Sequence, residues 1–216
     1  LKERMEAAGW ETASVWTGGR PYVSRPLVRL VKRRLRAPVQ RSDGSFEART
    51  AGSEASEAFG EYLSKSNAMF RKHWILRRGW TDVSLIEHLI EATLAVQPHL
   101  RAGRAVICDR YVYKSVVNLA ILLDLPLTEL PGLLRHPAVR LAPKPDLYFL
   151  MDLPASVAAE RKTDLPSLDY VARRVPVYRA LAAYANMPVV DATQPPDAVA
   201  CDIWEDVSRV LPARSS

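Results

Sequence analysis

The sequence has little cysteine and no apolar run long enough to cross a membrane. Its two cysteines, Cys108 and Cys201, lie far apart and share no metal-ligand spacing with histidines, so neither a disulfide framework nor a zinc site is indicated. No apolar segment approaches the roughly 20 residues of a membrane-spanning helix. The charged first ten residues are unlike a secretory signal. We therefore expect one soluble domain, residues 1–216, in a reducing, cytoplasmic compartment.

The sequence also lacks a strong charge imbalance. Its 30 lysines and arginines against 24 aspartates and glutamates give a net charge of +6. This charge favours anionic partners but does not separate a nucleotide enzyme from a nucleic-acid binder. The densest positive run, residues 29–36, has no aromatic stacking pattern beside it. Nucleic-acid binding is therefore the least favoured class.

No internal repeat is present, and apolar runs alternate with amphipathic segments along the chain. Strands are predicted at 12–16, 105–109, 146–151 and 188–191. Helices are predicted at 1–8, 26–36, 59–74, 83–100, 112–123, 155–162, 170–185 and 197–211. This alternation predicts an α/β fold, a three-layer doubly wound parallel sheet flanked by helices.

Three further segments have distinct patterns. Residues 37–56, rich in Gly, Ser, Ala and charge, are typical of a mobile loop or an insertion. Residues 127–141 form a short amphipathic piece that two prolines break. The closing helix has an apolar stripe expected to face inward, made of Val199, Ile203, Val207 and Val210.

The first residues of the chain have the pattern of a helix already under way. Leu1, Met5 and Ala8 share one face at helical spacing, and Gly9 suits a left-handed stop after the last turn. There is no initiator methionine. We expect the front of this helix to lie outside the sequence, in an N-terminally truncated chain.

The most informative stretch is 105–111, a run of β-favouring apolar residues that ends in Asp109, Arg110 and Tyr111. Ligands of open α/β sheets bind beyond the carboxyl ends of the strands. An acid beside an arginine suits phosphate chemistry, because the carboxylate can hold magnesium and the guanidinium can grip phosphate oxygens with two donors. The alternative is a salt bridge at the strand end.

Three segments in order resemble the thymidylate kinase family of P-loop nucleoside monophosphate kinases. Residues 98–111 are similar to that family's helix, glycine turn, strand and Asp-Arg-Tyr motif. Residues 145–161 resemble the strand and helix that lead into its lid, here a compact lid at 161–175. Residues 189–207 resemble the final strand, adenine-side loop and last helix.

The resemblance implies roles for individual residues. Asp109 would organise magnesium and position the acceptor phosphate, Arg110 would bind that phosphate, and Tyr111 would shape the acceptor pocket. Arg161 would be a lid arginine that stabilises the transferred phosphoryl group, with a solvated helix end as the alternative.

Further contacts follow from the same resemblance. The acceptor side would include Gly18, Gly19 and His88, and the adenine side of ATP would be lined by Asp191, Ala192 and Thr193. On lid closure, Arg161 could be joined by Arg173, Arg174 and Arg179, for each of which a surface role is the alternative.

The sequence also departs from the family pattern. A G-x-x-x-x-G-K-[ST] loop, which cradles donor phosphates, is absent. The family places this loop and the first strand before the helix with which the chain opens. We therefore expect both to be missing, and the fragment alone to be inactive as a kinase. The early loop 15–20 lacks the arginine and the acid that thymidylate kinases place before the glycines, which leaves the acceptor nucleotide open.

Two functions from different classes follow. The first is ATP-dependent phosphoryl transfer to a nucleoside monophosphate, foremost dTMP to dTDP, with Mg²⁺ and ATP and with a homodimer as one arrangement. The alternative is a non-catalytic thymidylate kinase-like domain that binds nucleotides or another protein.

Overall fold

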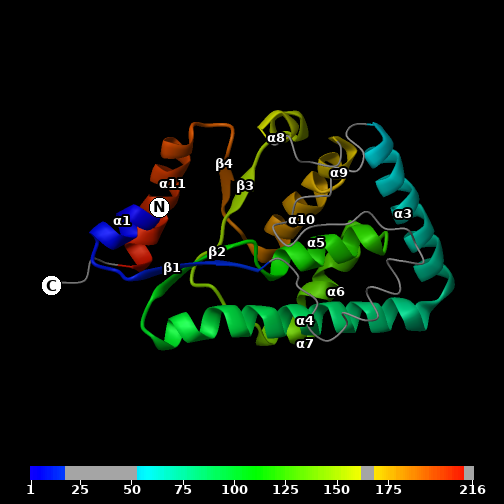
Figure 1. Ribbon diagram of the computed structural model, residues 1–216, viewed down its shortest axis with the longest axis horizontal. Helices are drawn as coiled ribbons and strands as arrows, with labels where there is room; N and C mark the ends of the chain where they lie inside the picture. Colours follow the sequence, from blue (N-terminus) through cyan, green and yellow to red (C-terminus); the bar gives the residue numbers. More distant parts are fainter. Residues whose placement is uncertain (18–52, 162–167, 212–216) are drawn as a thin grey trace.

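The computed structural model describes residues 1–17, 53–161 and 168–211 (Figure 1). It contains two small parallel sheets among helices. Strand β1 (Thr12–Trp16) pairs with β2 (Ala105–Asp109), and β3 (Leu150–Asp152) pairs with β4 (Val189–Asp191). Parallel pairing of strands that are separated by helices confirms the α/β alternation read from the sequence.

The predicted single sheet is not what the described residues form, because the four strands make two separate pairs. The third predicted strand, 146–151, is also shorter than expected and pairs only from Leu150 onward. Its partner β4 has three residues and therefore offers three pairing positions. The preceding Leu147 and Phe149 instead pack their side chains into a small core beside β2.

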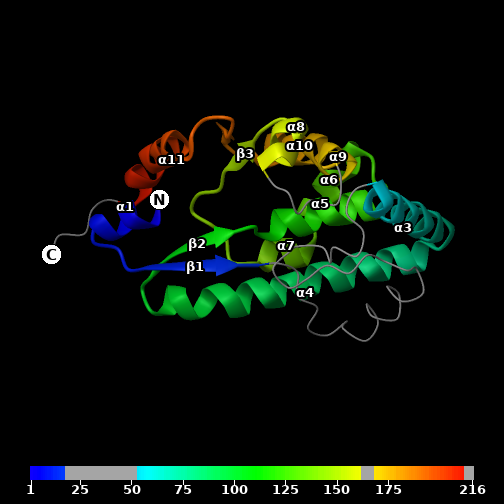
Figure 2. The ribbon, with the colours of Figure 1, turned by 45° about the horizontal axis from the view of Figure 1, so that its top comes forward.

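The helices follow the predicted order but differ in length. They are α1 (Lys2–Ala7), α3 (Ser53–Lys72), α4 (Trp74–Arg101), α5 (Val112–Leu122), α6 (Leu130–Leu134), α7 (Pro137–Leu141), α8 (Ala155–Arg161), α9 (Leu168–Ala172), α10 (Val175–Ala185) and α11 (Pro196–Val210), with a 3₁₀ turn at Leu127–Glu129. Figure 2 shows β1 and β2 side by side above the long helix α4. None of the helices in the described ranges is long and apolar enough to cross a membrane.

Several predicted boundaries were wrong, and prolines account for three of them. Pro131 and Pro137 lie in the first turns of α6 and α7, where their missing N–H groups cost nothing, so they start helices rather than only break one. The helix expected at 170–185 is two helices, because Pro176 cannot continue the turn from α9 and instead lies in the first turn of α10.

Helix α3 begins earlier than expected. It starts at Ser53, so residues 53–56 are helical and not part of a loop. The remaining 37–52 of the expected loop, and the helix predicted at 26–36, lie outside the described residues. At the other end of the sequence, Gly9 has a φ of 85°, as expected for a glycine that ends the first helix.

Two hydrophobic cores hold these elements together. The larger joins α3, α4, α5, α6 and α10 through fully buried side chains, including Leu85, Val116, Val117, Leu130 and Leu181. The smaller one packs α1 and α11 against β2 through Met5, Ala105, Val199, Ile203 and Val207. Val210, which was expected to face inward, is 44% exposed. Cys108 is half-buried, Cys201 is exposed, and both cysteines are free.

The larger core makes a stability prediction with an internal control. Leu130 is fully buried, whereas Leu127, three residues earlier, is 40% exposed. Leu130→Ala should lower the free energy of unfolding by about 2–5 kcal/mol, because it leaves a cavity in packed surroundings. Leu127→Ala should cost less than about 1 kcal/mol. Urea unfolding followed by circular dichroism measures both, and equal losses would show that α6 is not anchored in the core.

Candidate functional site

The carboxyl ends of β1 and β2 meet at one point, which the register of the pair determines. Trp16 pairs with Asp109, so the next residues, Thr17 and Arg110, also come together. The buried hydroxyl of Thr17 donates a hydrogen bond to the Arg110 carbonyl, and the Cys108 thiol donates to the same oxygen at 3.5 Å. This carbonyl is therefore anchored from two sides.

Arg110 has an unusual backbone conformation at this junction. Its φ is 62°, in the left-handed region that non-glycine residues rarely occupy. Such a conformation costs on the order of 1–3 kcal/mol and persists where the surrounding contacts impose it. Here the strand ends abruptly, α5 begins two residues later, and Asp109 and Arg110 are both exposed. The structure thus places both residues at the strand end, as predicted.

Tyr111 precedes the first residue of α5 and anchors the start of this helix. Its hydroxyl donates a hydrogen bond to the Pro143 carbonyl, and its ring meets the His88 ring edge-on with 6.1 Å between centroids. Burial, together with the neighbouring Cys108, raises the pKa of the phenol, so it stays protonated at neutral pH. Tyr111 therefore fixes the turn from β2 into α5.

Lys114 is a second cation at this point, and the sequence analysis did not assign it a role. It extends from the first turn of α5, with its Nζ 5.2 Å from the centroid of the Trp16 ring. Burial lowers its pKa to about 8, with Arg110 and Arg174 acting in the same direction and Glu91 and Asp109 opposing it. The side chain is thus close enough to all four for direct electrostatic interaction.

Arg174 is a third cation, held between α9 and α10. It donates to the Tyr170 carbonyl at 2.9 Å, its guanidinium lies 3.5 Å from the centroid of the Tyr170 ring, and it reaches Asn118 Oδ1 on α5 at 3.4 Å. Burial and the neighbouring Arg110 lower its pKa. Of the three arginines considered for lid closure, Arg174 is the one that reaches α5.

The other two arginines form ion pairs elsewhere. Arg173 pairs with Asp169 at 2.7 Å on the exposed side of α9. Arg179 grips Asp152 at the end of β3 with two nitrogens, at 2.9–3.1 Å.

His88 lies beside Tyr111 and is almost completely buried, with 2% exposure. Its Nδ1 is 3.0 Å from Ser115 Oγ and 3.8 Å from a carboxylate oxygen of Glu91, which is also buried. Its Nε2 has no hydrogen-bond partner among the described residues. Burial, and then the charge of Lys114, lower the pKa of the imidazole to about 4. His88 is therefore neutral at physiological pH, and its contact with the acceptor remains a prediction.

A second group of predicted residues gathers at the end of β4. Asp191 Oδ1 accepts hydrogen bonds from the Thr193 backbone N–H at 2.8 Å and from the Thr193 hydroxyl at 2.6 Å, which lowers the pKa of Asp191. Arg161, from the end of α8, donates to the Ala192 carbonyl at 2.6 Å and to the Thr193 carbonyl at 2.9 Å. Hydrogen bonds thus join the Arg161 side chain to the backbone of the 191–193 turn.

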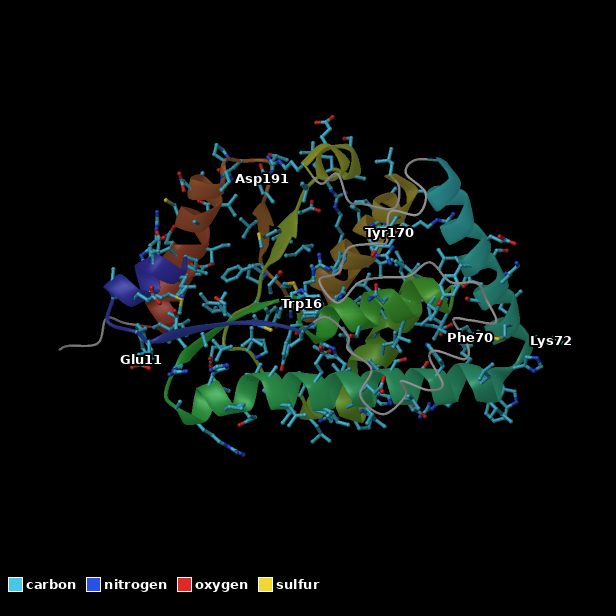
Figure 3. The ribbon with its side chains drawn as sticks, in the orientation of Figure 1. Glu11, Trp16, Phe70, Lys72, Tyr170 and Asp191 are labelled. Atoms are coloured by element: carbon cyan, nitrogen blue, oxygen red, sulfur yellow. The ribbon has the colours of Figure 1, made fainter. Side chains whose placement is uncertain are left out.

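The two groups are separate among the residues that the structure describes. Figure 3 shows Trp16, the strand partner of Asp109, well away from Asp191. As placed, Arg161 contacts the predicted adenine-side turn, and its role at the moving phosphoryl group remains a prediction. Gly18 and Gly19 lie outside the described residues, as does the central part of the predicted lid, 162–167.

His88 makes a prediction about acid stability. Its pKa is about 4 in the folded protein against 6.5 for an unperturbed imidazole. Between these values the unfolded chain binds more protons, so the free energy of unfolding falls as the pH drops from about 6.5 to 4. At its largest the effect is about 3 kcal/mol.

The matched variants are His88→Gln and His73→Gln, since His73 is an exposed histidine. His88→Gln should remove most of this acid-dependent loss, whereas His73→Gln should retain it. Urea unfolding at several pH values between 4 and 7 measures the difference. An unchanged pH slope in His88→Gln would show that His88 is not held neutral by burial.

Comparison with known proteins supports the family suggested by the motifs. No protein-family model matches the chain. It is 29% identical over 155 residues to a protein of Pyrobaculum aerophilum named "probable thymidylate kinase", a match that covers 65% of this chain and 76% of the relative. It is 32% identical over 142 residues to a thymidylate kinase of Solidesulfovibrio magneticus, covering 58% and 66%. A "probable thymidylate kinase" of Archaeoglobus fulgidus is 30% identical over 137 residues, covering 60% and 64%.

These matches cover 76%, 66% and 64% of the three relatives' lengths. They nevertheless agree with one another and with the Asp-Arg-Tyr segment at the end of β2. The chain belongs to the thymidylate kinase family.

Proposed function

We propose that this protein transfers a phosphoryl group from ATP to a nucleoside monophosphate, with dTMP as the first candidate acceptor and dTDP as product. The observation that carries the proposal is the exposed Asp109–Arg110 pair at the carboxyl end of β2, in a relative of thymidylate kinases. Phosphoryl transfer depends on positioning and on electrostatic stabilisation. Arg110 would position the acceptor phosphate, and Asp109 would hold the Mg²⁺ that stabilises the phosphate charge.

Asp109 suits a magnesium site of the kind that nucleotides complete. Within the described ranges, no three His, Cys, Asp or Glu side chains gather to hold a metal by themselves. Mg²⁺ is commonly held by one or two carboxylates, with substrate phosphates and water supplying the other ligands. The exposed carboxylate of Asp109 fits that arrangement. Mg²⁺ bound there would neutralise charge on the phosphates.

Arg110 would hold the acceptor phosphate. Its carbonyl is fixed by Thr17 and Cys108, so the backbone that carries the guanidinium has little freedom. A planar guanidinium can donate two parallel hydrogen bonds to one phosphate. Arg110 would thus align the acceptor oxygen for attack, and alignment of this kind contributes strongly to rate.

The 191–193 turn would line the adenine side of the phosphoryl donor, ATP. Arg161 donates hydrogen bonds to two carbonyls of that turn. The 216 residues contain no G-x-x-x-x-G-K-[ST] sequence, which supplies the backbone cradle and the lysine for the donor phosphates. We therefore expect these 216 residues alone to turn over slowly at best.

The direct test is an ADP-release assay with the product of the complete reading frame and a panel of nucleoside monophosphates. The proposal expects stimulation by dTMP or a related pyrimidine nucleotide. If no monophosphate stimulates ADP release, the kinase proposal is wrong. Calorimetric binding of nucleotides by such an inactive protein would then favour the non-catalytic alternative.

Asp109→Asn tests the catalytic carboxylate. It removes the charge but keeps the shape, so kcat should fall by roughly 100-fold or more while the melting temperature stays near that of the parent. Asp206→Asn, which removes an exposed carboxylate on α11, is the control for loss of one negative charge. A large drop in melting temperature, or parental turnover, would make Asp109 a structural residue.

Arg110 and Arg161 should separate by kinetics. Arg110→Ala should mainly raise the KM for the acceptor, because the acceptor phosphate loses the hydrogen bonds of the guanidinium. Arg161→Ala should mainly lower kcat, by roughly 10³-fold if Arg161 stabilises the transferred charge. Steady-state kinetics on both variants decides. A raised KM for ATP with kcat intact would instead assign Arg161 to the 191–193 turn that it contacts here.

A further inference from the structure

Three cations lie near the end of β2. Arg110 and Lys114 are close in the sequence, whereas Arg174 follows Lys114 by 60 residues. Arg110 comes from the junction of β2 and α5, Lys114 from the first turn of α5, and Arg174 from the short segment between α9 and α10. Lys114 interacts electrostatically with Arg110 and with Arg174, and Arg174 with Arg110. The three charges therefore share one small region of the molecule.

Packing holds Lys114 and Arg174 in this region. Arg174 reaches the side chain of Asn118 at 3.4 Å, and Asn118 lies one helical turn after Lys114 on α5. The guanidinium also lies against the Tyr170 ring, as the Lys114 ammonium lies over Trp16. Both side chains are half-buried. Their convergence is thus built into the fold and is not a chance meeting of solvated side chains.

Burial and like charge both disfavour the protonated forms of these cations, Lys114 and Arg174. Asp109 and Glu91 are the carboxylates that favour the charged form of Lys114 in the part of the chain described. The amino end of α5, which begins three residues after Asp109, adds a further partial positive charge. A bound dianion would favour the charged forms of Lys114 and Arg174.

We propose that Lys114 and Arg174 bind the terminal phosphate dianion of the acceptor together with Arg110, and so make the site selective for phosphomonoesters over nucleosides. The inference rests on the proposed function and extends it to two residues to which the family resemblance gives no acceptor role. Arg110 aligns the phosphate from the strand end, while Lys114 and Arg174 reach it from α5 and from the α9–α10 segment.

Calorimetric titration of the complete gene product with dTMP and with thymidine isolates the contribution of the phosphate. Lys114→Met and Arg174→Gln should each weaken dTMP binding by about 10- to 100-fold, the usual effect of losing one charged hydrogen bond. Thymidine binding should stay the same in both variants. The charge-preserving Lys114→Arg and Arg174→Lys should recover most of the lost affinity.

Two exposed cations serve as matched controls, namely Lys65 on α3 and Arg209 on α11. Lys65→Gln and Arg209→Gln each remove one positive charge and should leave dTMP binding unchanged. If they weaken it as much as the site variants do, net charge and not a built site explains the effect. Since Arg174 also packs on Tyr170, thermal unfolding checks that its variants fold, and the Lys114 variants decide the question if they do not.

The outcomes separate this inference from the proposed function. A parent protein that binds dTMP, with Lys114→Met and Arg174→Gln binding it equally well, overturns the inference and leaves the kinase proposal standing. If the parent binds no nucleoside monophosphate, the kinase proposal fails. Titration with inorganic phosphate, followed by phosphorus NMR, then tests the anion site alone. Phosphate binding that Lys114→Met abolishes supports the site, and binding that it leaves unchanged overturns it.

Discussion

The parallel pairing of β1 with β2 is the constraint on which the candidate site depends. Its register brings Thr17 to Arg110, and the hydrogen bond from the buried Thr17 hydroxyl holds the Arg110 carbonyl while the backbone turns through a left-handed conformation. That turn ends the strand and starts α5 within two residues. As a result Asp109, Arg110 and Lys114 project from one short segment, where an anion would meet a carboxylate and two cations.

The rest of the fold supports this junction. Helices α1 and α11 cover β2 through the smaller core, and the larger core anchors α5 against its neighbours. Tyr111 donates a hydrogen bond to the Pro143 carbonyl, and the ring of the neutral His88 packs edge-on against the Tyr111 ring. Because α5 also carries the Asn118 contact to Arg174, one helix positions charges that the sequence separates by 60 residues.

Local patterns predicted the elements that local physics determines. The strands at 12–16 and 105–109 and helices α5 and α11 follow from apolar runs and from helical spacing, and the strand-end position of Asp109 and Arg110 follows with them. Contacts between distant segments could not be read in this way. Nothing local indicates that Arg161 binds the 191–193 carbonyls, that Arg174 reaches α5, or that the four strands form two pairs. A weak sequence signal pointed to Lys114 as a site residue, because it is a lysine in the first turn of the helix that follows Asp109.

The central claim is that the end of β2 binds the acceptor phosphate. A crystal structure of the protein with dTMP tests it most directly. The account predicts phosphate oxygens within about 3 Å of the Arg110 guanidinium, the usual length of such a hydrogen bond, with Asp109 beside them. An ordered nucleotide whose phosphate lies away from Arg110, at the 191–193 turn or elsewhere, would contradict it.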